Sequence, residues 1–276
     1  MIKNRRILIT GIAGTIGSEL CRQLYKSNKI FGLDINESGL HDLVAELGIA
    51  GRVGDIRSPE TIHDVFSDFK PQIIFHAAAL KHVDFCEKYP EECTKTNVLG
   101  TENLVAEAGK WECVEKFIFI STDKATIPVS YMGATKKCGE ILVKNRGYQV
   151  VRFGNVIGSR GSLFTIWDKQ IEKGEPITVT DTRMERYFMS IKDACELVIE
   201  AAETNFNMMV LDMGDPVNIY ALAKIYVSVK GKPDYPIKVI GKRPGEVLKE
   251  KLMSDEELKS AEVYEGKFWI INGQRT

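Results

Sequence analysis

The stretch STDKATIPVSYMGATKK, residues 121–137, gathers the side chains of this sequence that are best suited to move protons. A hydroxyl, a carboxylate and an amine follow one another at Thr122, Asp123 and Lys124, and a second amine, Lys136, follows twelve residues later. Such groups act as general acids and bases once their surroundings shift their pKa values toward neutrality. We therefore expect acid-base chemistry here, and a salt-bridged surface turn is the alternative.

The residue before Lys136 on the same helical face is a methionine. Met132 lies four residues earlier, and a thioether has no proton to give or take. Tyr131 has a suitable phenol, but a five-residue offset turns its side chain about 140° away from the face of Lys136. The group that would accept a proton at this place is therefore left open.

The elements around this stretch alternate between short apolar runs and segments of helical spacing. The apolar runs are residues 6–10, 29–34, 51–55, 72–79, 116–122, 148–154 and 208–214. Near-continuous apolar strands joined by helices are typical of a parallel sheet covered on both faces. The sequence thus predicts an α/β protein with a Rossmann-like, doubly wound sheet, whose fifth strand ends at the start of the stretch 121–137.

After residue 154 the alternation loosens into segments rich in turn residues, which predicts a smaller, discontinuous substrate-binding lobe. We assign residues 1–154 and 188–214 to a dinucleotide-binding domain, and residues 155–187 and 215–276 to the lobe. The lobe should cover the carboxyl ends of the strands, where α/β sheets bind ligands.

Charge and composition exclude several classes of function. The 276 residues include 37 basic and 38 acidic side chains, which are scattered along the chain, so nucleic-acid binding gains no support. No stretch approaches the roughly 18 apolar residues that cross a bilayer, which predicts a cytoplasmic protein without membrane contact. Six cysteines lack metal-ligand spacing, so we expect reduced thiols and no metal site.

The segment ITGIAGTIGSEL places Gly11, Gly14 and Gly17 between the first strand and a helix. This GxxGxxG spacing allows a tight turn and a close approach of backbone N–H groups to a pyrophosphate at the helix N-terminus. Asp34 ends the second strand, where a carboxylate can accept hydrogen bonds from an adenosine ribose. That favours NAD over NADP, although Lys26 and Lys29 leave NADP open.

Small residues after the fourth strand would let the backbone lie against this tightly bound dinucleotide. The expected cofactor contacts are Gly11, Gly14, Thr15, Ile16, Gly17, Asp34, Asp55, Ile56, Ala77, Ala78 and Ala79. His76 and His82 flank the small residues, and we interpret them as core or rim histidines rather than catalytic groups.

Six motifs in one order resemble a known family. GxxGxxG, HAAALKHV, STDKA followed by MGATK, VRFGNVIGSRGS, RYFMSI and RPGE are similar to those of the extended short-chain dehydrogenases/reductases of polysaccharide biosynthesis. The closest group is the CapD-like nucleotide-sugar 4,6-dehydratases, and the resemblance runs from residue 7 to about residue 255. It implies UDP-N-acetylglucosamine as substrate, oxidised at C4 by NAD(P), dehydrated across C5 and C6, and reduced at C6. It leaves retention or inversion at C5 open.

The resemblance also implies roles for single residues. Thr122 would hold the C4 hydroxyl, Asp123 would be the general acid at C6, and Lys124 the base at C5. Lys136 would bind the nicotinamide ribose. Many relatives have tyrosine where Met132 stands and some have methionine, so Met132 would only pack against the sugar or nicotinamide. The proton from C4 would then pass through the Asp123, Lys124 and Lys136 groups, with Thr122 or a water.

Substrate contacts follow from the same resemblance. They are Lys81, Asn155, Arg186, Arg243 and Glu246, with the arginines at the diphosphate, whose oxygens their planar forks can engage in pairs. Trp167 and Tyr187 could flank a base, but we expect them in the core.

Two other functions stay open from the sequence. A C4 epimerase of the same fold would need oxidation at C4 but no dehydration pair, so Asp123 and Lys124 favour the dehydratase. A catalytically silent, nucleotide-binding regulator is supported only by the missing tyrosine. A homo-oligomer is compatible with either enzyme.

Overall fold

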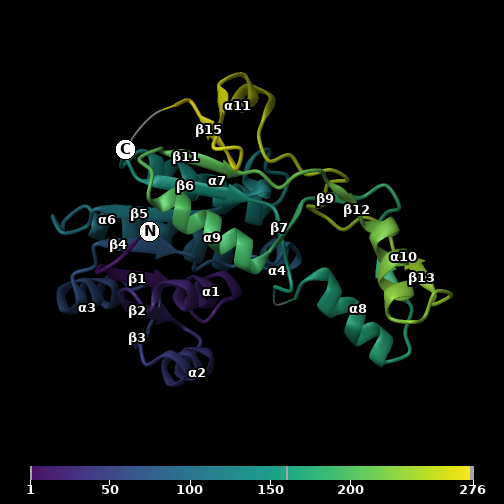
Figure 1. Cartoon of the computed structure of the whole chain (residues 1–276), viewed down its shortest axis with the longest axis horizontal. Coiled ribbons are helices and arrows are strands. Elements are labelled where there is room, and N and C mark those ends of the chain that lie inside the picture. Colours follow the sequence, from purple (N-terminus) through teal and green to yellow (C-terminus); the bar gives the residue numbers. More distant parts are fainter. Residues whose placement is uncertain (1, 160, 274–276) are drawn as a thin grey trace.

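The computed structural model describes residues 2–159 and 161–273, which form a large sheet-containing part and a smaller lobe (Figure 1). The strand order of the large sheet is β14-β15-β11-β6-β5-β4-β1-β2-β3. Its strands are β1 (Arg6–Thr10), β2 (Lys29–Asp34), β3 (Ala50–Val53), β4 (Ile73–His76), β5 (Lys116–Thr122), β6 (Gln149–Phe153), β11 (Met208–Leu211), β14 (Ala261–Tyr264) and β15 (Phe268–Ile271).

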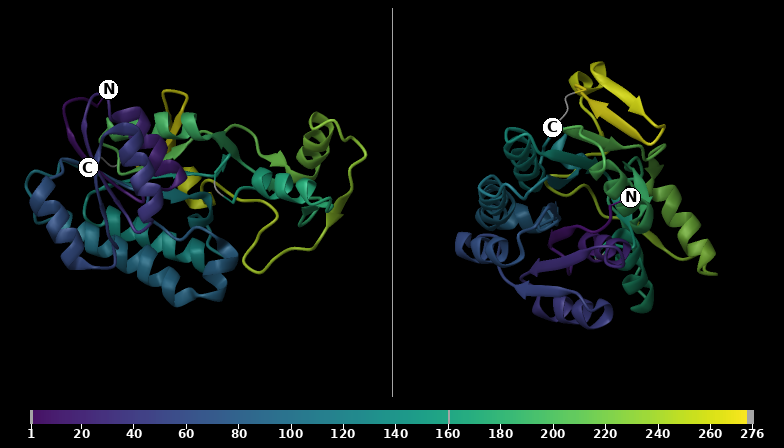
Figure 2. Two further views of the ribbon diagram at one scale, coloured as in Figure 1. Left: turned by 90° about the horizontal axis from the view of Figure 1, so that it is seen from below. Right: turned by 60° about the vertical axis from the view of Figure 1, so that its left-hand side comes forward.

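Helices cover both faces of this sheet, which buries the apolar strands as their composition predicted. The long helices are α1 (Thr15–Leu24), α2 (Glu37–Leu47), α3 (Pro59–Phe69), α6 (Gly100–Ala108), α7 (Tyr131–Lys144) and α9 (Ile191–Ala202). Helix α1 packs against α9 on one face, and α3, α6 and α7 pack in series on the other (Figure 2). Short helical segments are α4 (Val83–Lys88), α5 (Pro90–Thr94), the π-helix η1 (Lys95–Leu99), the 3-10 helix η2 (Asp123–Ala125) and α11 (Asp255–Lys259).

In the order of the sheet, the seven neighbouring strands β11, β6, β5, β4, β1, β2 and β3 all pair in parallel. This pairing confirms the doubly wound α/β fold. The sheet continues beyond β11 with the antiparallel hairpin of β14 and β15. Residues 261–271 therefore belong to the large sheet, and their assignment to the lobe from sequence was wrong. The cause is a tight turn in which Glu265 and Gly266 both have positive φ, with buried residues after it that extend the core of the sheet.

The lobe has its own small core. Its elements are β7 (Asn155–Ile157), α8 (Leu163–Glu172), β8 (Ile177–Val179), β9 (Glu185–Arg186), β12 (Val217–Asn218), α10 (Ile219–Val229) and β13 (Ile237–Val239). Strand β10 (Phe188–Ser190), at the start of the range 188–214 that we assigned to the dinucleotide-binding domain, pairs in parallel with β7 and contacts both cores, through Phe188 that of the lobe and through Met189 that of the large sheet. Trp167 is fully buried at the centre of this core, and its indole N–H donates to the Thr178 carbonyl at 2.9 Å. Tyr187 packs against the core of the large sheet. Both aromatics are thus core residues, as expected.

A segment that we call the strap, residues 246–257, returns the chain from the lobe to the large sheet. Near its start, Arg186 donates to the carbonyl oxygens of Val247 at 2.8 Å and Leu248 at 3.1 Å. Further along, the Leu252 carbonyl accepts from Arg152 at 2.9 Å and from the Thr126 hydroxyl at 3.1 Å. The strap is therefore held to both parts of the protein.

Within the described ranges, the helices are too short or too polar to cross a membrane.

Candidate active site

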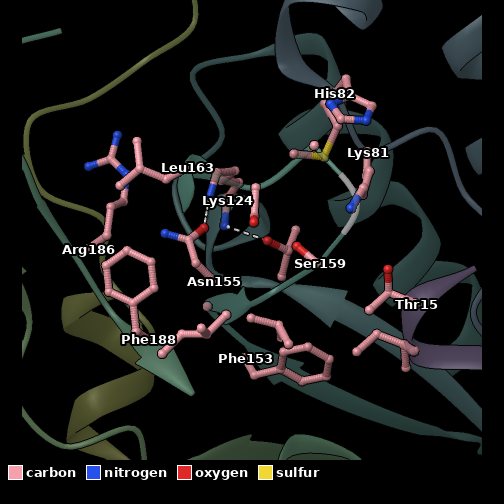
Figure 3. A pocket seen from close by; sticks show the side chains of 18 of the residues that line it. Thr15, Lys81, His82, Lys124, Phe153, Asn155, Ser159, Leu163, Arg186 and Phe188 are labelled. Carbon is pink, nitrogen blue, oxygen red and sulfur yellow. Dashed lines mark hydrogen bonds between the residues drawn. The ribbon is translucent and has the colours of Figure 1, made fainter. Parts of the chain in front are cut away.

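A cavity of about 660 Å³ lies where the carboxyl ends of the parallel strands meet the lobe (Figure 3), a size that suits a small-molecule site. The start of α1, the loop after β4, the end of β5, the start of α7 and the lobe all contribute to its lining. Sixteen of the residues singled out from sequence line it: Gly11, Gly14, Thr15, Ile16, Gly17, Ala77, Ala79, Lys81, Thr122, Lys124, Met132, Lys136, Asn155, Arg186, Arg243 and Glu246.

The glycine loop is shaped for a close approach between backbone segments. Gly11 has a φ of +68°, and a Cβ on it would come within 2.6 Å of the Ala78 backbone. A Cβ on Gly17 would come within 2.3 Å of the Gly11 carbonyl oxygen. Only glycine fits either place. The first turn of α1 has no acidic residue, and its N-cap Gly14 offers no side-chain cap, so this helix end suits an anionic ligand.

Asp34 lies outside the cavity lining and holds the glycine loop instead. Its carboxylate accepts from the backbone N–H of Ala13 at 2.8 Å and from that of Asn36 at 2.9 Å. The carboxylate has room for further hydrogen bonds, because two oxygens offer about four acceptor sites. Ribose recognition by Asp34 stays a prediction.

Three other expected cofactor contacts, Asp55, Ile56 and Ala78, are also not among the residues that line the cavity. The Asp55 carboxylate pairs with Arg57 at 2.6 Å. Ile56 is buried in the main core, where a Cβ on Gly100 would come within 2.7 Å of its Cδ1 atom. Ala78 packs its backbone against Gly11.

His76 is a fully buried core residue, as interpreted from sequence. Its Nδ1 lies 2.7 Å from the Thr10 hydroxyl and its Nε2 lies 2.9 Å from the Thr101 hydroxyl. Since Thr101 donates its hydrogen to the Asn97 carbonyl at 2.7 Å, it accepts from His76, which assigns the neutral tautomer with hydrogen on Nε2. Burial, together with the charge of Lys136, lowers the pKa of His76 to about 3, so this ring stays neutral. His82 is exposed on the rim of the cavity.

The end of β5 brings Thr122, Asp123 and Lys124 together through their side chains. Asp123 Oδ1 accepts from the Thr122 hydroxyl at 2.9 Å and from Lys124 Nζ at 2.9 Å. The Asp123 carboxyl is buried and lies outside the cavity lining, whereas Thr122 and Lys124 line the cavity. Its second oxygen, Oδ2, is buried without a hydrogen-bond partner among the described residues. The surface-turn alternative for this motif is therefore wrong.

Lys124 has further polar neighbours on the lobe side. Its Nζ lies 3.4 Å from Asn155 Oδ1, a contact visible in Figure 3. It also lies 3.7 Å from Glu250 Oε1, in the strap. The sequence analysis did not single out Glu250, because one glutamate in the charged run GEVLKEKL carries no sign of burial.

Met132 and Lys136 share the cavity face of α7, as their spacing predicted. Met132 is buried against Cys86 and Cys93. Lys136 Nζ donates to the Ile120 carbonyl at 2.6 Å and lies 3.8 Å from the centre of the Phe119 ring. Burial lowers the pKa of Lys136 to about 7. Tyr131 is about half exposed and lies outside the cavity lining.

Asn97 is a second residue that sequence reasoning missed. It lies in the π-helix η1, where its side chain bonds both the N–H and the carbonyl of Leu80, at 2.8 and 2.9 Å. It also donates to the Thr135 hydroxyl at 3.0 Å. Asn97 thereby ties the loop after β4 to α7. A π-helical turn is frequent at functional sites, but no residue type in the sequence announces one.

The two arginines expected at a diphosphate differ in availability. Arg186 directs three of its five N–H groups at the carbonyl oxygens of Glu185, Val247 and Leu248, so its first task is to hold the strap. Arg243 has an exposed side chain at the cavity. The Arg243 backbone N–H donates to Glu246 Oε2 at 3.0 Å, which shapes the RPGE turn.

The chain is similar to known proteins over almost all its length. A family model described as polysaccharide biosynthesis protein matches residues 7–272. Capsular polysaccharide biosynthesis protein CapD of Staphylococcus aureus is 41% identical, over 96% of this chain and 47% of CapD. This chain spans about half the length of the first curated relatives it matches.

Two further similarities cover most of both chains. A UDP-glucose 4-epimerase of Rickettsia typhi is 33% identical, over 98% of this chain and 84% of the epimerase. The X-ray structure of Pen from Bacillus thuringiensis superposes with a TM-score of 0.91 and 31% identity, over 98% of this chain and 88% of Pen.

Proposed function

The chain belongs to the polysaccharide biosynthesis protein family, and on this premise we propose that it is a nucleotide-sugar 4,6-dehydratase. The proposed substrate is UDP-N-acetylglucosamine, and the product is a UDP-4-keto-6-deoxy sugar. A bound NAD(P) would supply the oxidation at C4 and the reduction at C6. The glycine loop, the uncapped start of α1 and Lys136 would hold this dinucleotide.

The observation that carries this proposal is a lysine that faces the cavity with a buried carboxyl behind it. Exchange of configuration at C4 requires no group at C5 or C6. Dehydration requires a base for the C5 proton and an acid for the C6 hydroxyl. Lys124 and Asp123, 2.9 Å apart, supply one group of each kind.

Because Met132 stands where many relatives have a tyrosine, other groups have to accept the proton of the C4 hydroxyl. Thr122 lines the cavity and donates to Asp123, so a proton from the C4 hydroxyl reaches Asp123 through the Thr122 hydroxyl. The proton is accepted by Asp123 Oδ1, the oxygen that the Thr122 hydroxyl contacts at 2.9 Å, while the buried Oδ2 has no hydrogen-bond partner among the described residues. That proton then leaves with the C6 hydroxyl as water, delivered through Thr122 or a water.

Lys124 takes the C5 proton and gives it back to C5 after C6 has been reduced. The electron pair of the C5–H bond moves toward the C4 ketone, which acidifies that proton. The lysine has to be neutral to begin, although an ordinary lysine is protonated at pH 7. Return of the proton to one face of the ring or the other decides the configuration at C5.

A C4 epimerase is the second candidate, because the Rickettsia typhi relative bears that name and is matched over most of its length. Proton NMR of the purified protein with UDP-N-acetylglucosamine in D₂O separates the two functions. We expect a C6 methyl signal and deuterium at C5. A galacto-configured product without a methyl signal would support the epimerase, and an unchanged spectrum after NAD⁺ and NADP⁺ are added would contradict both enzymes.

Replacing Met132 by leucine should leave the turnover number close to that of the wild type. Leucine has a similar volume and no ionisable group, so the free energy of unfolding should change by less than about 1.5 kcal/mol. The rate of methyl-signal growth and a urea titration measure the two quantities. A drop in turnover of about 100-fold, the size of a lost proton-transfer group, would show that the thioether takes part in the chemistry.

A further inference from the structure

Glu250 is a buried carboxylate that the proposed reaction does not yet use. Its side chain is only 9% exposed, and its Oε1 atom lies between two cations. Lys124 Nζ is 3.7 Å from this oxygen and Arg186 Nη2 is 3.8 Å from it. Glu250 thus contacts both a proposed catalytic lysine and an arginine that lines the same cavity.

The strap fixes Glu250 in this place from both sides. Two residues before it, Arg186 binds the Leu248 carbonyl, and two residues after it, Arg152 and Thr126 bind the Leu252 carbonyl. Arg152 is itself fully buried and paired with Glu140 at 2.8 Å. The backbone on both sides of Glu250 is therefore held by the folded core.

The charged groups that face Glu250 are Asp123, Lys124 and Arg186. Burial raises the pKa of Glu250, and the Asp123 charge adds to this effect, whereas Lys124 and Arg186 oppose it. Asp123 and Glu250 lie 2.9 and 3.7 Å from the amine of Lys124, which lines the cavity. Glu250 can therefore hold a proton more readily than an exposed glutamate can.

We propose that Glu250 is a positioning residue that takes the proton which Lys124 must lose before it can act as a base. The proton moves from Lys124 Nζ to Glu250 Oε1 through one bridging water, since the two atoms lie 3.7 Å apart, and an ion pair becomes a neutral amine beside a neutral carboxyl. Closure of the cavity by a bound sugar favours this neutral pair, because charge separation costs more when water is excluded. The amine then takes the C5 proton, and no oxidant or further reactant is involved.

This inference rests on the proposed dehydratase, and a pH profile of kcat/KM tests it there. In the wild type, the acidic limb reports protonation of Glu250 in the pair. In Glu250→Gln no carboxyl group can take the proton of Lys124, so the lysine has to lose it to solvent. The acidic limb of the kcat/KM profile should then move to higher pH by at least about one unit. Activity at pH 7 should fall by up to about 100-fold and recover in part at alkaline pH.

Two variants separate this role from a merely structural one. Glu250→Asp keeps a carboxyl group and should keep the wild-type limb at a lower rate. Glu185→Gln is the matched control, because Glu185 pairs at 2.9 Å with Lys249, an exposed lysine of the strap, and it should change neither limb nor rate. A uniform loss at all pH values in Glu250→Gln, with the limb unmoved, would overturn the proposal.

A titration without turnover keeps the two proposals distinguishable. Lysines labelled with ¹³C at Cε are followed by NMR in the full chain, and the Lys124 signal is identified by its loss in Lys124→Arg. We expect a step in this signal as Glu250 titrates, and the loss of this step in Glu250→Gln. Identical titrations would reject the pair, whereas a coupled pair in a protein that forms no methyl product would reject the dehydratase alone.

Discussion

Replacing Lys124 by methionine should lower the turnover number for dehydration by about 10²- to 10⁴-fold, the contribution of one general acid-base group. Methionine retains much of the apolar stem of lysine but cannot take a proton from C5. Deuterium incorporation at C5 in D₂O should fall with the methyl signal, because both depend on the same proton transfer. Proton NMR of the reaction measures the two together.

Binding and folding have to survive for this result to be informative. The Lys124 side chain is 20% exposed and its amine faces the cavity, so its loss leaves the buried core intact. Titration calorimetry with UDP should give an affinity close to that of the wild type. Lys249→Met is the matched control, since Lys249 lies on the strap but is 67% exposed and pairs only with Glu185 among the described ion pairs. It should retain full turnover.

A different result would move the base elsewhere. If Lys124→Met raised KM and left kcat unchanged, the lysine would bind substrate rather than take the proton. If C5 still exchanged with solvent while the methyl signal was lost, the missing function would be protonation of the C6 hydroxyl. Either outcome would change the roles of Lys124 and Asp123 without affecting the position of the cavity.

Sequence patterns predicted the parts of the site that local chemistry decides. Six of the seven parallel strands are recognisable as short, largely apolar runs that are buried in the sheet, whereas β3 lies at the sheet edge and is mostly exposed. Their order along the chain places the glycine loop and the STDK motif at the same edge of the sheet. Lys136 and Met132 follow from helical spacing alone, and the structure puts both at the cavity.

Contacts between segments far apart in sequence could not be predicted in this way. Glu250 is 126 residues from Lys124, and only the path of the strap brings the two within 3.7 Å. Arg186 has the residue type expected at a diphosphate, yet three of its five donors point at backbone carbonyl groups, two of them in the strap. The role of a long polar side chain thus depends on the backbone that passes beside it.

Replacing Glu140 by glutamine should destabilise the protein by about 1.5–3 kcal/mol, the contribution of hydrogen bonds to a charged group, because Arg152 keeps Glu257 as a second partner at 2.8 Å. Arg152 is fully buried, and its guanidinium binds both carboxylate oxygens of Glu140, at 2.9 and 2.8 Å. Glutamine keeps the volume of the side chain and removes the charge. Urea denaturation gives the change, and Glu46→Gln, which breaks the exposed pair with Arg22, should have little effect.

The pH dependence of unfolding gives an independent check. Burial alone would raise the pKa of Glu140, but hydrogen bonds and the charge of Arg152 outweigh it, so this pKa lies below its ordinary value. A carboxyl group with a lowered folded pKa stabilises the protein above its unfolded pKa, near 4.3, and loses this contribution as pH falls through the folded pKa. As the pH falls below the unfolded pKa of about 4.3, the wild type should therefore lose more stability than Glu140→Gln does. Parallel curves for the two proteins would contradict the assignment.

The Arg152 cluster also connects stability to the proposed chemistry. Besides Glu140, Arg152 binds the Leu252 carbonyl at 2.9 Å and the Glu257 carboxylate at 2.8 Å. One guanidinium therefore joins β6 and α7 to the strap. Weakening it should loosen the strap before the sheet unfolds, and amide hydrogen exchange in residues 247–253 should then rise more than exchange in β5. Because Glu250 lies in that segment, Glu140→Gln should also lower turnover at temperatures where the sheet remains folded. Unchanged exchange in the strap would show that its other contacts, with Arg186 and Thr126, are enough to hold Glu250 beside Lys124.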